Sequence, residues 1–437
     1  MRDVDVVIIG GGVAGLSADA TLRASGLRTV VLEQDASGAG GRVKTIDLHG
    51  APVELGAAFL ADFYHDAIEL LRNRKPEVLV PRDTETYVVR AGSPLPAWPV
   101  DVLAKSSLLT LGSKLRLLSL CFPMLYHWRH LDSADLGRSR NADSRSIRQV
   151  CQTWAGSAGT ASFIEPLLRG LFYWDIGTTT QVSILMMLKE ASRGLDLFRV
   201  AGGLRTLVGF ASEGATLILD AKVMSTEACP EGVRTRALVG GAEEVFTSRG
   251  AVLATTADVA LKVASGMLSP EVTRFLASVG YSRTTCVVLR SDAVDVPSGT
   301  LLFERDESPF IVSVNPVSAD NGSTNRTVCV FLSTAGHDET EGLEADELGD
   351  FCRAELSRLL DKPAWLGTAI VAAVQRWPRA LPNFAVGQIK TMTEVRPDLP
   401  IGGRLALAGD YLGGPHIGGA MLSGRIAGEK LAAALPV

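Results

Sequence analysis

The stretch VDVVIIGGGVAGLSADATLRASG, residues 4–26, decides the fold of this chain. It opens with an apolar run that predicts a strand over residues 4–9, and it closes with the apolar spacing of a helix. The turn between them carries Gly10, Gly12 and Gly15. In this order the first glycine makes the turn, the second lets the backbone approach a phosphate, and the third lets the helix pack on the strand. The stretch therefore predicts a phosphate-binding turn between a strand and a helix.

A second strand is predicted immediately afterwards, over residues 29–32, and Glu33 stands at its end. Parallel strands joined by a helix form an open α/β sheet whose ligand lies at the carboxyl ends of the strands. At that position the carboxylate of Glu33 can accept hydrogen bonds from both hydroxyls of a ribose. We therefore expect a dinucleotide here. A solvated Glu33 beside a plain glycine turn is the alternative interpretation.

Two stretches that follow favour FAD over NAD. Gly41 and Arg42 come shortly after the second strand, where the guanidinium can neutralise a pyrophosphate. Gly56 and Ala57 belong to a run of small residues that lets the backbone lie against a flat ring. These four residues are predicted to bind the cofactor.

The end of the chain carries the last cofactor signal. A strand is predicted over residues 405–408, followed by Gly409 and by Asp410, whose carboxylate can bind a ribityl hydroxyl. A final helix is predicted over residues 419–434, and its amino terminus would point at the flavin carbonyl that gains negative charge on reduction. The residues expected to contact the flavin from this helix are Gly419, Ala420 and Met421.

Together these stretches resemble the FAD-dependent amine oxidase and protoporphyrinogen oxidase superfamily, which also contains the carotenoid-type desaturases. The resemblance covers both ends of the chain well and the middle thinly. It implies an α/β fold, with a Rossmann-like FAD-binding domain of the two-dinucleotide-binding type and an inserted α+β substrate domain. It also assigns an adenine contact to Val223, and it matches QRWPRALP, residues 375–382, to the segment ahead of the last FAD unit.

The predicted FAD-binding domain is discontinuous. It comprises residues 1–81, 195–262 and 385–437, and the substrate domain comprises residues 82–194, mainly helical, and 263–384. Strand patterns in the middle of the chain fall at residues 216–223, 233–238, 250–254, 285–289 and 327–332.

Two departures from the superfamily bear on the chemistry. Many amine oxidases hold a water near the flavin with a lysine in the second substrate segment, but residues 281–361 contain no lysine. The loop over residues 410–420 contains no cysteine, so the thioether to flavin of some relatives is not expected. We therefore expect FAD to be bound non-covalently, without the usual water site.

In this superfamily the flavin carries out the redox chemistry, so the protein must orient the substrate and exclude water. Glu54 precedes the predicted flavin loop and is a candidate proton acceptor, although a carboxylate there also suits an anchor for the backbone. Tyr173 is a second catalytic candidate. His416, in the closing loop, is either an acid or base at the flavin or a solvent-facing side chain. The predicted substrate pocket consists of Phe59, Tyr173, Trp174 and Trp377, for which core packing is the alternative.

Composition limits the partners of the chain. Its 437 residues carry a net charge of −5 with the Lys and Arg residues scattered, which argues against nucleic acid. The six cysteines are far apart, so we expect reduced thiols, no metal and a cytoplasmic protein. There is no signal peptide pattern and no run long enough to span a membrane. Residues 103–126 and the HWRH that follows predict either a core helix or an amphipathic patch in peripheral contact with a bilayer.

We therefore predict an FAD-dependent oxidase that removes hydride from a C–N bond of a mainly apolar or amine substrate, with oxygen as electron acceptor, in specialised biosynthesis. Two alternatives stay open. One is a protoporphyrinogen-oxidase-like or carotenoid-type dehydrogenase that acts on a C–C bond. The other is a flavin-dependent isomerase without net redox change. The sequence leaves the oligomeric state open.

Overall fold

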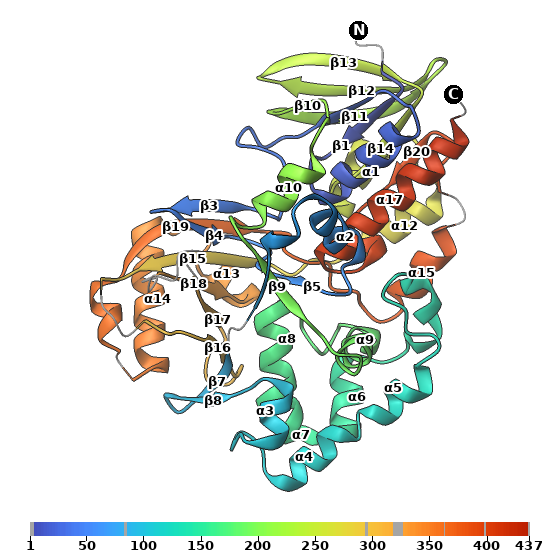
Figure 1. The fold of residues 1–437 in the computed structure, drawn as a ribbon. Coiled ribbons are helices and arrows are strands. Elements are labelled where there is room, and N and C mark those ends of the chain that lie inside the picture. The colour runs from blue at the N-terminus through green and yellow to red at the C-terminus, as the bar shows by residue number, and fades with distance from the viewer. Residues whose placement is uncertain are drawn as a thin grey trace.

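The structure is a computed structural model and describes residues 4–82, 85–292, 296–317, 327–361, 363–396 and 399–435. A parallel sheet lies at the end of the molecule that holds both termini, and a larger sheet lies at the opposite side (Figure 1). A layer of helices fills the remaining corner beneath them. The elements of each layer come from distant parts of the chain.

The parallel sheet has five strands in the order β10-β2-β1-β14-β20. The central strand β1 is completely buried, because helices and other strands cover both faces of the sheet. Its register pairs Val6 with Thr29 on β2 and with Gly250 on β14. The strands are β1 Val6–Ile9, β2 Thr29–Leu32, β10 Leu217–Ile218, β14 Gly250–Leu253 and β20 Leu405–Leu407.

Helices α1 (Val13–Ala24) and α17 (Ile417–Ala434) lie side by side on this sheet (Figure 1). Their close approach depends on glycine: a Cβ atom on Gly424 would lie 2.0 Å from the carbonyl oxygen of Ala14. The first and last helices of the chain are therefore packed backbone to backbone. The predicted strand–turn–helix units at both ends of the chain are confirmed, with limits that differ by at most two residues.

The strand predicted over residues 216–223 is wrong, because the structure has two separate strands there. Residues 216–223 split into β10 in the parallel sheet and β11 in a separate three-stranded antiparallel sheet. The break falls at Asp220, whose φ of 50° turns the chain out of the first sheet. That second sheet consists of β11 Ala221–Cys229, β12 Gly232–Val239 and β13 Ala242–Ser248.

The larger sheet has seven strands in the order β19-β15-β18-β17-β16-β7-β8. Successive side chains along each strand face two different cores. On β15, Val287 and Leu289 face the helix α14, whereas Cys286 and Val288 face the interior between the domains. The second face forms the wall of the site described below. The elements are β7 Thr86–Arg90, β8 Ser93–Pro96, β15 Thr284–Arg290, β16 Thr300–Phe303, β17 Ile311–Pro316, β18 Thr327–Leu332, α13 Thr334–Glu339, α14 Ala345–Leu359 and β19 Ile370–Trp377.

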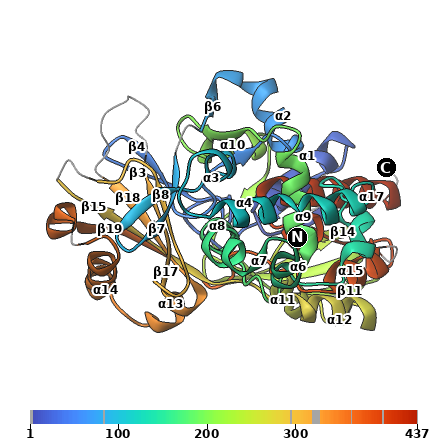
Figure 2. The same ribbon diagram turned by 90° about the horizontal axis from the view of Figure 1, so that it is seen from below.

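The segment predicted to be mainly helical, residues 82–194, also supplies the strands β7 and β8. Its helices form the layer at the lower edge of Figure 1, and Figure 2 looks at this layer from below. Residues 103–126 are not one helix, because the chain turns at residues 105–110 and 119–120. The helices are α3 Pro99–Ala104, α4 Leu111–Leu118, α5 Cys121–His127, α6 Ile147–Trp154, α7 Gly156–Gly159, α8 Glu165–Phe172 and α9 Gln181–Ala191.

Smaller elements connect the two domains. The ribbon β3-β4 and the sheet β5-β9-β6 lie between the large sheets (Figure 1), and the pairing of β6 with β9 joins two separate segments of the predicted FAD-binding domain, residues 1–81 and 195–262. Those limits stay a prediction. The strands and α-helices not yet given are β3 Thr45–Leu48, β4 Ala51–Glu54, β5 Leu60–Ala61, α2 His65–Arg74, β6 Leu79–Pro81, β9 Leu197–Val200, α10 Arg205–Ala211, α11 Ala257–Val263, α12 Pro270–Ser278, α15 Gln388–Val395 and α16 Asp410–Gly413.

Candidate active site

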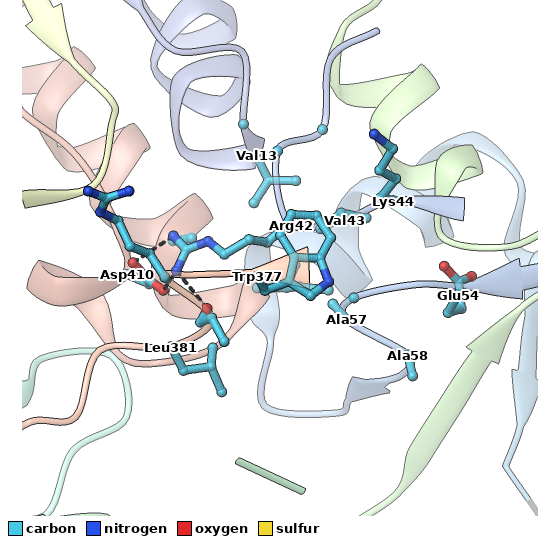
Figure 3. Close-up of a pocket in the computed structure, with 18 of the residues that line it drawn as sticks. Val13, Arg42, Val43, Lys44, Glu54, Ala57, Ala58, Trp377, Leu381 and Asp410 are labelled. Carbon is cyan, nitrogen blue, oxygen red and sulfur yellow. Dashed lines mark hydrogen bonds and ion pairs between the residues drawn. The ribbon is translucent and has the colours of Figure 1, made fainter. Parts of the chain in front are cut away.

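A cavity of about 610 Å³ runs between the two domains. Its wall takes residues from the turn after β1, the loop after β4, the end of α8, the inner face of the seven-stranded sheet and the loop after β20. Figure 3 shows its central part. Eleven of the predicted cofactor residues line it: Gly10, Gly12, Glu33, Gly41, Arg42, Gly56, Ala57, Val223, Gly409, Asp410 and Ala420. The cofactor motifs, which lie far apart in sequence, thus meet around one space.

The three glycines of the first turn have different surroundings. A Cβ atom on Gly15 would lie 2.0 Å from the carbonyl oxygen of Gly10, so this residue is required for packing and does not line the cavity. A Cβ atom on Gly10 would lie 2.6 Å from the carbonyl oxygen of Ala254. At Gly12 no heavy atom lies within 4 Å of such an atom, and this residue does line the cavity. The open space beside Gly12 fits the pyrophosphate expected there.

Glu33 lies at the carboxyl end of β2, where the sequence predicted a ribose contact. Its Oε2 accepts a hydrogen bond from the Gly11 N–H at 2.7 Å, and its Oε1 accepts one from the Asp35 N–H at 2.8 Å. A carboxylate has about four acceptor positions, so capacity for ribose hydroxyls remains. The backbone contacts fix the orientation of Glu33 at the cavity wall.

Arg42 and Asp410 form a bidentate ion pair across the cavity (Figure 3). The two guanidinium nitrogens of Arg42 donate to the Asp410 carboxylate at 2.8 and 3.0 Å, and one of them also donates to the carbonyl oxygen of Ala380 at 2.9 Å. Burial acts to lower the pKa of Arg42, but the Asp410 carboxylate and the nearby Tyr281 together more than offset this, so the pKa lies above its ordinary value. Arg42 therefore stays charged, at the position where the sequence predicted a cation for the pyrophosphate. The sequence did not indicate that these two residues are partners.

The flavin loop predicted at residues 55–59 packs tightly against Trp377. The indole Nε1 donates to the carbonyl oxygen of Leu55 at 2.7 Å. A Cβ atom on Gly56 would lie 2.2 Å from the carbonyl oxygen of Arg42, and Ala57 donates its N–H to the same oxygen at 3.1 Å. Trp377, which we predicted as a substrate residue, therefore both lines the cavity and holds this loop in place.

Two residues of the last helix that we predicted to touch the flavin do not line the cavity. Met421 points into the core of the FAD-binding domain and is 4% exposed. Gly419 packs against the loop before the helix, where a Cβ atom would lie 2.5 Å from the carbonyl oxygen of Gly414. The helix turns these positions away from the cavity, and only Ala420 of the predicted three lines it.

His416 caps the final helix at the cavity wall. Its Nδ1 accepts a hydrogen bond from the Gly419 N–H at 2.9 Å, and its ring stacks on Tyr64 with 4.5 Å between ring centroids. Burial lowers the pKa of His416 to about 4. The imidazole is therefore neutral at pH 7, and because Nδ1 is an acceptor, its proton is assigned to Nε2. The ring of His416 is half-buried and lines the cavity, and its role as an acid or base at the flavin stays a prediction.

Glu54, the first catalytic candidate, is engaged on both oxygens. Oε1 accepts the Leu204 N–H at 2.7 Å, and Oε2 accepts the hydroxyl proton of Thr45 at 2.7 Å. Burial raises its pKa to about 7, because the hydrogen bonds only partly offset the loss of water. Figure 3 shows Glu54 beyond Ala57 and apart from the Arg42–Asp410 pair. These contacts favour the anchoring interpretation of Glu54, since they tie β4 to the loop before α10.

Tyr173, the second catalytic candidate, ends α8 in a left-handed conformation with φ of 57°. This turn aims its side chain at the cavity, where its ring lies 5.8 Å from that of Phe331. Burial raises the pKa of Tyr173 well above its ordinary value, so the phenol stays protonated. The predicted pocket residue Trp174 is different: it is 3% exposed, stacks on Phe172 and does not line the cavity. Its assignment to the substrate pocket is wrong.

The substrate half of the cavity also contains a cation that the sequence did not reveal. The guanidinium of Arg82 lies 5.0 Å from the centroid of the Phe59 ring, and it donates to the hydroxyl of Thr300 at 3.3 Å. Burial lowers the pKa of Arg82 to about 10, so it is charged at pH 7. Phe59 lines the cavity as predicted.

The inner face of the seven-stranded sheet forms the far wall. It contributes Thr284, Asn315, Cys329, Phe331 and Gln375. Among the described residues that line the cavity the single lysine is Lys44, which pairs with Asp35 at 3.1 Å on the adenosine side. The far wall therefore offers aromatic and polar groups and Arg376, but no lysine among the described residues that line the cavity.

Known proteins share both the sequence pattern and the fold. The pattern of the family described as flavin containing amine oxidoreductase matches residues 13–432. The mitochondrial protoporphyrinogen oxidase of Nicotiana tabacum is 33% identical over 170 residues, which cover 38% of this chain and 32% of the tobacco enzyme. The pseudooxynicotine dehydrogenase of a Pseudomonas species is 50% identical over 58 residues, 13% of this chain and 12% of that enzyme. These matches span a third or less of either relative.

The structural likeness extends over the whole chain. The structure of wild-type putrescine oxidase bound to putrescine superimposes with a TM-score of 0.75 at 19% identity, and the match covers 99% of each chain. At this identity the likeness shows a common fold, with a Rossmann-like FAD-binding domain and a substrate domain. The family pattern spans nearly the entire sequence, and the matched residues include most of the motifs that surround the cavity. The chain belongs to the flavin-containing amine oxidoreductase family and is an FAD-dependent oxidoreductase.

Proposed function

We propose that this enzyme removes hydride from a C–N bond of a mainly apolar amine and passes the electrons to oxygen. The observation that carries the proposal is the aromatic wall of the cavity next to the predicted flavin loop: Phe59, Phe172, Tyr173 and Phe331. Such a wall suits an apolar molecule and orients it without a dedicated base. FAD accepts the hydride when bound. The names of two similar proteins, pseudooxynicotine dehydrogenase and putrescine oxidase, support an amine.

The charges of the cavity define the form in which an amine binds. Arg82 is a half-buried cation in the substrate half, and the carboxylate of Glu54 is already engaged with Thr45 and Leu204. An ammonium ion brought into this space would meet a like charge without a free carboxylate partner. The substrate therefore binds as the neutral amine, whose nitrogen lone pair is also required for hydride loss.

A second candidate is dehydrogenation of a C–C bond. The feature that favours it is the far wall, where Thr284 and its neighbours offer no lysine to hold a water near the flavin. The 33% identity to the tobacco protoporphyrinogen oxidase over 170 residues also supports this second candidate. The electron acceptor would then be a molecule other than oxygen.

We propose that FAD is held without a covalent bond. The loop over residues 410–420 has no cysteine. Cys329, on the opposite wall, is buried and directs its thiol at the carbonyl oxygen of Glu54. Acid or heat denaturation should release the flavin into the supernatant, and a yellow precipitate would contradict this.

A cytoplasmic location and a role in specialised biosynthesis also stay proposals; the free state of all six cysteines supports the first.

Anaerobic reduction of the purified enzyme distinguishes these functions. The flavin absorbance is followed while amines, or porphyrinogen and polyene compounds, are added, and air is then admitted. Bleaching by an amine with rapid recolouring in air supports the amine oxidase. Bleaching by the C–C substrates alone supports the dehydrogenase. Conversion of substrate without any use of oxygen or dye would select a flavin-dependent isomerase.

A further inference from the structure

Helices α4 and α5 expose a stripe of large apolar side chains to solvent. Leu111, Leu115, Leu118, Phe122 and Leu125 are between 48% and 74% exposed, and Tyr126 is 83% exposed. The first five follow each other at steps of three and four residues, the spacing of one helix face. Ser119 and Leu120 between the two helices keep helical backbone angles, so the stripe continues from α4 into α5.

The opposite side of the same helices already packs on the protein. Leu120 and Met124 are buried in the main core, and Leu117 is partly buried against it. A surface helix of a globular protein normally turns its polar side outward. Here the outward side carries large apolar side chains, and none of the residues of α4 is buried. The outward side therefore needs a partner that is itself apolar.

The charged side chains of the segment that carries the stripe, residues 103–130, are all basic, with Asp101 and Asp132 just outside it. Residues 103–130 contain Lys105, Lys114, Arg116 and Arg129 and no Asp or Glu, in a chain whose net charge is −5. In the part of the chain that the structure describes, none of the four forms an ion pair. This combination of exposed leucines, aromatic residues and unpaired basic residues matches a helix that lies in the surface of an anionic bilayer.

The position of the stripe agrees with this partner. Figure 1 shows α4 and α5 at the edge of the molecule farthest from both termini, and Figure 2 shows α4 lying across that face. None of the described helices is long and apolar enough to cross a membrane, so the contact is made in the plane of the surface. A second copy of the chain fits less well, because an interface of two identical stripes would bring the basic residues together.

We propose that α4 and α5 dock the enzyme on an anionic lipid bilayer, with the leucines and Phe122 among the acyl chains and Lys114 and Arg116 at the headgroups. The contact belongs to the helical layer that also contains α8, whose last residues line the cavity. An apolar substrate dissolved in the bilayer would then reach the enzyme without crossing water. The docking itself does not depend on which bond is oxidised.

The test is sedimentation of the full-length, FAD-loaded enzyme with lipid vesicles, followed by flavin absorbance in the pellet. The vesicles are phosphatidylcholine alone, or phosphatidylcholine with about one third phosphatidylglycerol. The wild type should bind the anionic vesicles, and less so as salt is raised. The double variant Lys114→Gln, Arg116→Gln should lose about thirtyfold in partition coefficient, and the triple variant Leu115→Gln, Phe122→Gln, Leu125→Gln more than a hundredfold.

The matched control is Leu219→Gln with Met224→Gln, which removes two exposed apolar side chains outside the stripe and should bind as the wild type does. An unchanged flavin spectrum and melting temperature show that each variant is folded. Failure of the wild type to bind anionic vesicles, or equal binding by the triple variant, overturns the proposal. A doubling of mass in light scattering that the triple variant abolishes, without vesicle binding, would assign the stripe to a second copy and also overturn it.

Discussion

Asp410 accepts two hydrogen bonds, at 2.8 and 3.0 Å, from Arg42, which precedes it by 368 residues in the chain. The pair joins the loop after β2 to the loop after β20, and the Asp410 side chain is 5% exposed. A cation held this firmly does not have to be ordered when the cofactor arrives, which lowers the cost of binding a pyrophosphate. The relationship gives the first prediction.

Arg42→Ala and Asp410→Asn should each weaken FAD binding by about ten- to a hundredfold, the loss expected for a charge-assisted hydrogen bond. The measurement is the dissociation constant of FAD by titration of the apoprotein. The control Arg283→Ala breaks an exposed ion pair with Asp338 in the other domain and should leave the constant unchanged. Equal FAD affinity in all three variants would remove the pair from the cofactor site.

Replacing Gly12 with alanine should affect FAD binding, whereas replacing Gly15 with alanine should affect folding. Gly12→Ala places the new atom in the open cavity at a φ of −68°, which alanine adopts readily, so the apoprotein should keep its melting temperature but lose FAD. Gly15→Ala drives the atom into the backbone of Gly10, so folding itself should fail or the melting temperature should fall. Retention of FAD by Gly12→Ala would show that no phosphate approaches this residue.

Glu54 should make the apoprotein less stable as the pH rises. Its pKa of about 7 in the folded state lies above the ordinary value of 4.5, so between these values the folded state holds a proton that the unfolded state has released. This titration alone should therefore lower the free energy of unfolding over this range, by about 3 kcal/mol in total. Glu54→Gln keeps an acceptor for Leu204 and should remove this contribution, as measured by urea unfolding of the variant and the wild type at several pH values.

The same variant tests whether Glu54 takes a proton in the reaction. As an anchor it should change kcat by less than about threefold once FAD is bound, whereas loss of a general base costs about a hundredfold or more. A hundredfold decrease in kcat with normal FAD binding would return Glu54 to the catalytic role that the sequence suggested.

His416 should have the opposite effect on stability. Its folded pKa of about 4 lies below the ordinary 6.5, so between these values the unfolded state binds the additional proton and stability is lost as the pH falls. The magnitude is again about 3 kcal/mol. His416→Asn keeps a helix cap and should remove this loss. The contributions of Glu54 and His416 nearly cancel in the wild type. In each variant the free energy of unfolding should therefore change with pH as the remaining residue dictates: it should rise with pH in Glu54→Gln and fall with pH in His416→Asn. The same pH dependence in both variants would contradict the assigned pKa values.

The sequence predicted the parts of the fold whose information is local. The strand, glycine turn, helix and Glu33 all fall within about thirty residues, and the structure reproduces them. The site was harder to predict because its partners are distant in the chain. Leu204 is 150 residues from the carboxylate it contacts in Glu54, and Thr300 is 218 residues from Arg82.

The aromatic run at the end of α8 shows a second reason why the site was hard to predict from the sequence. Phe172, Tyr173 and Trp174 are adjacent in sequence, yet Tyr173 enters the cavity and Trp174 enters the core. What separates them is the left-handed backbone of Tyr173, a conformation that a tyrosine seldom adopts and that composition does not indicate. The same applies to Asp220, where a positive φ divided one predicted strand between two sheets.

The packing of α17 on α1 has a consequence for biosynthesis of the protein itself. The ribosome produces Arg42 368 residues before Asp410, and the helix that carries Gly424 follows later still. Until then the parallel sheet lacks β20 and the first helix lacks its neighbour. We therefore expect the nascent chain to bind FAD only after Asp410 and Gly424 have been synthesised, so that the yellow colour should appear after this stage.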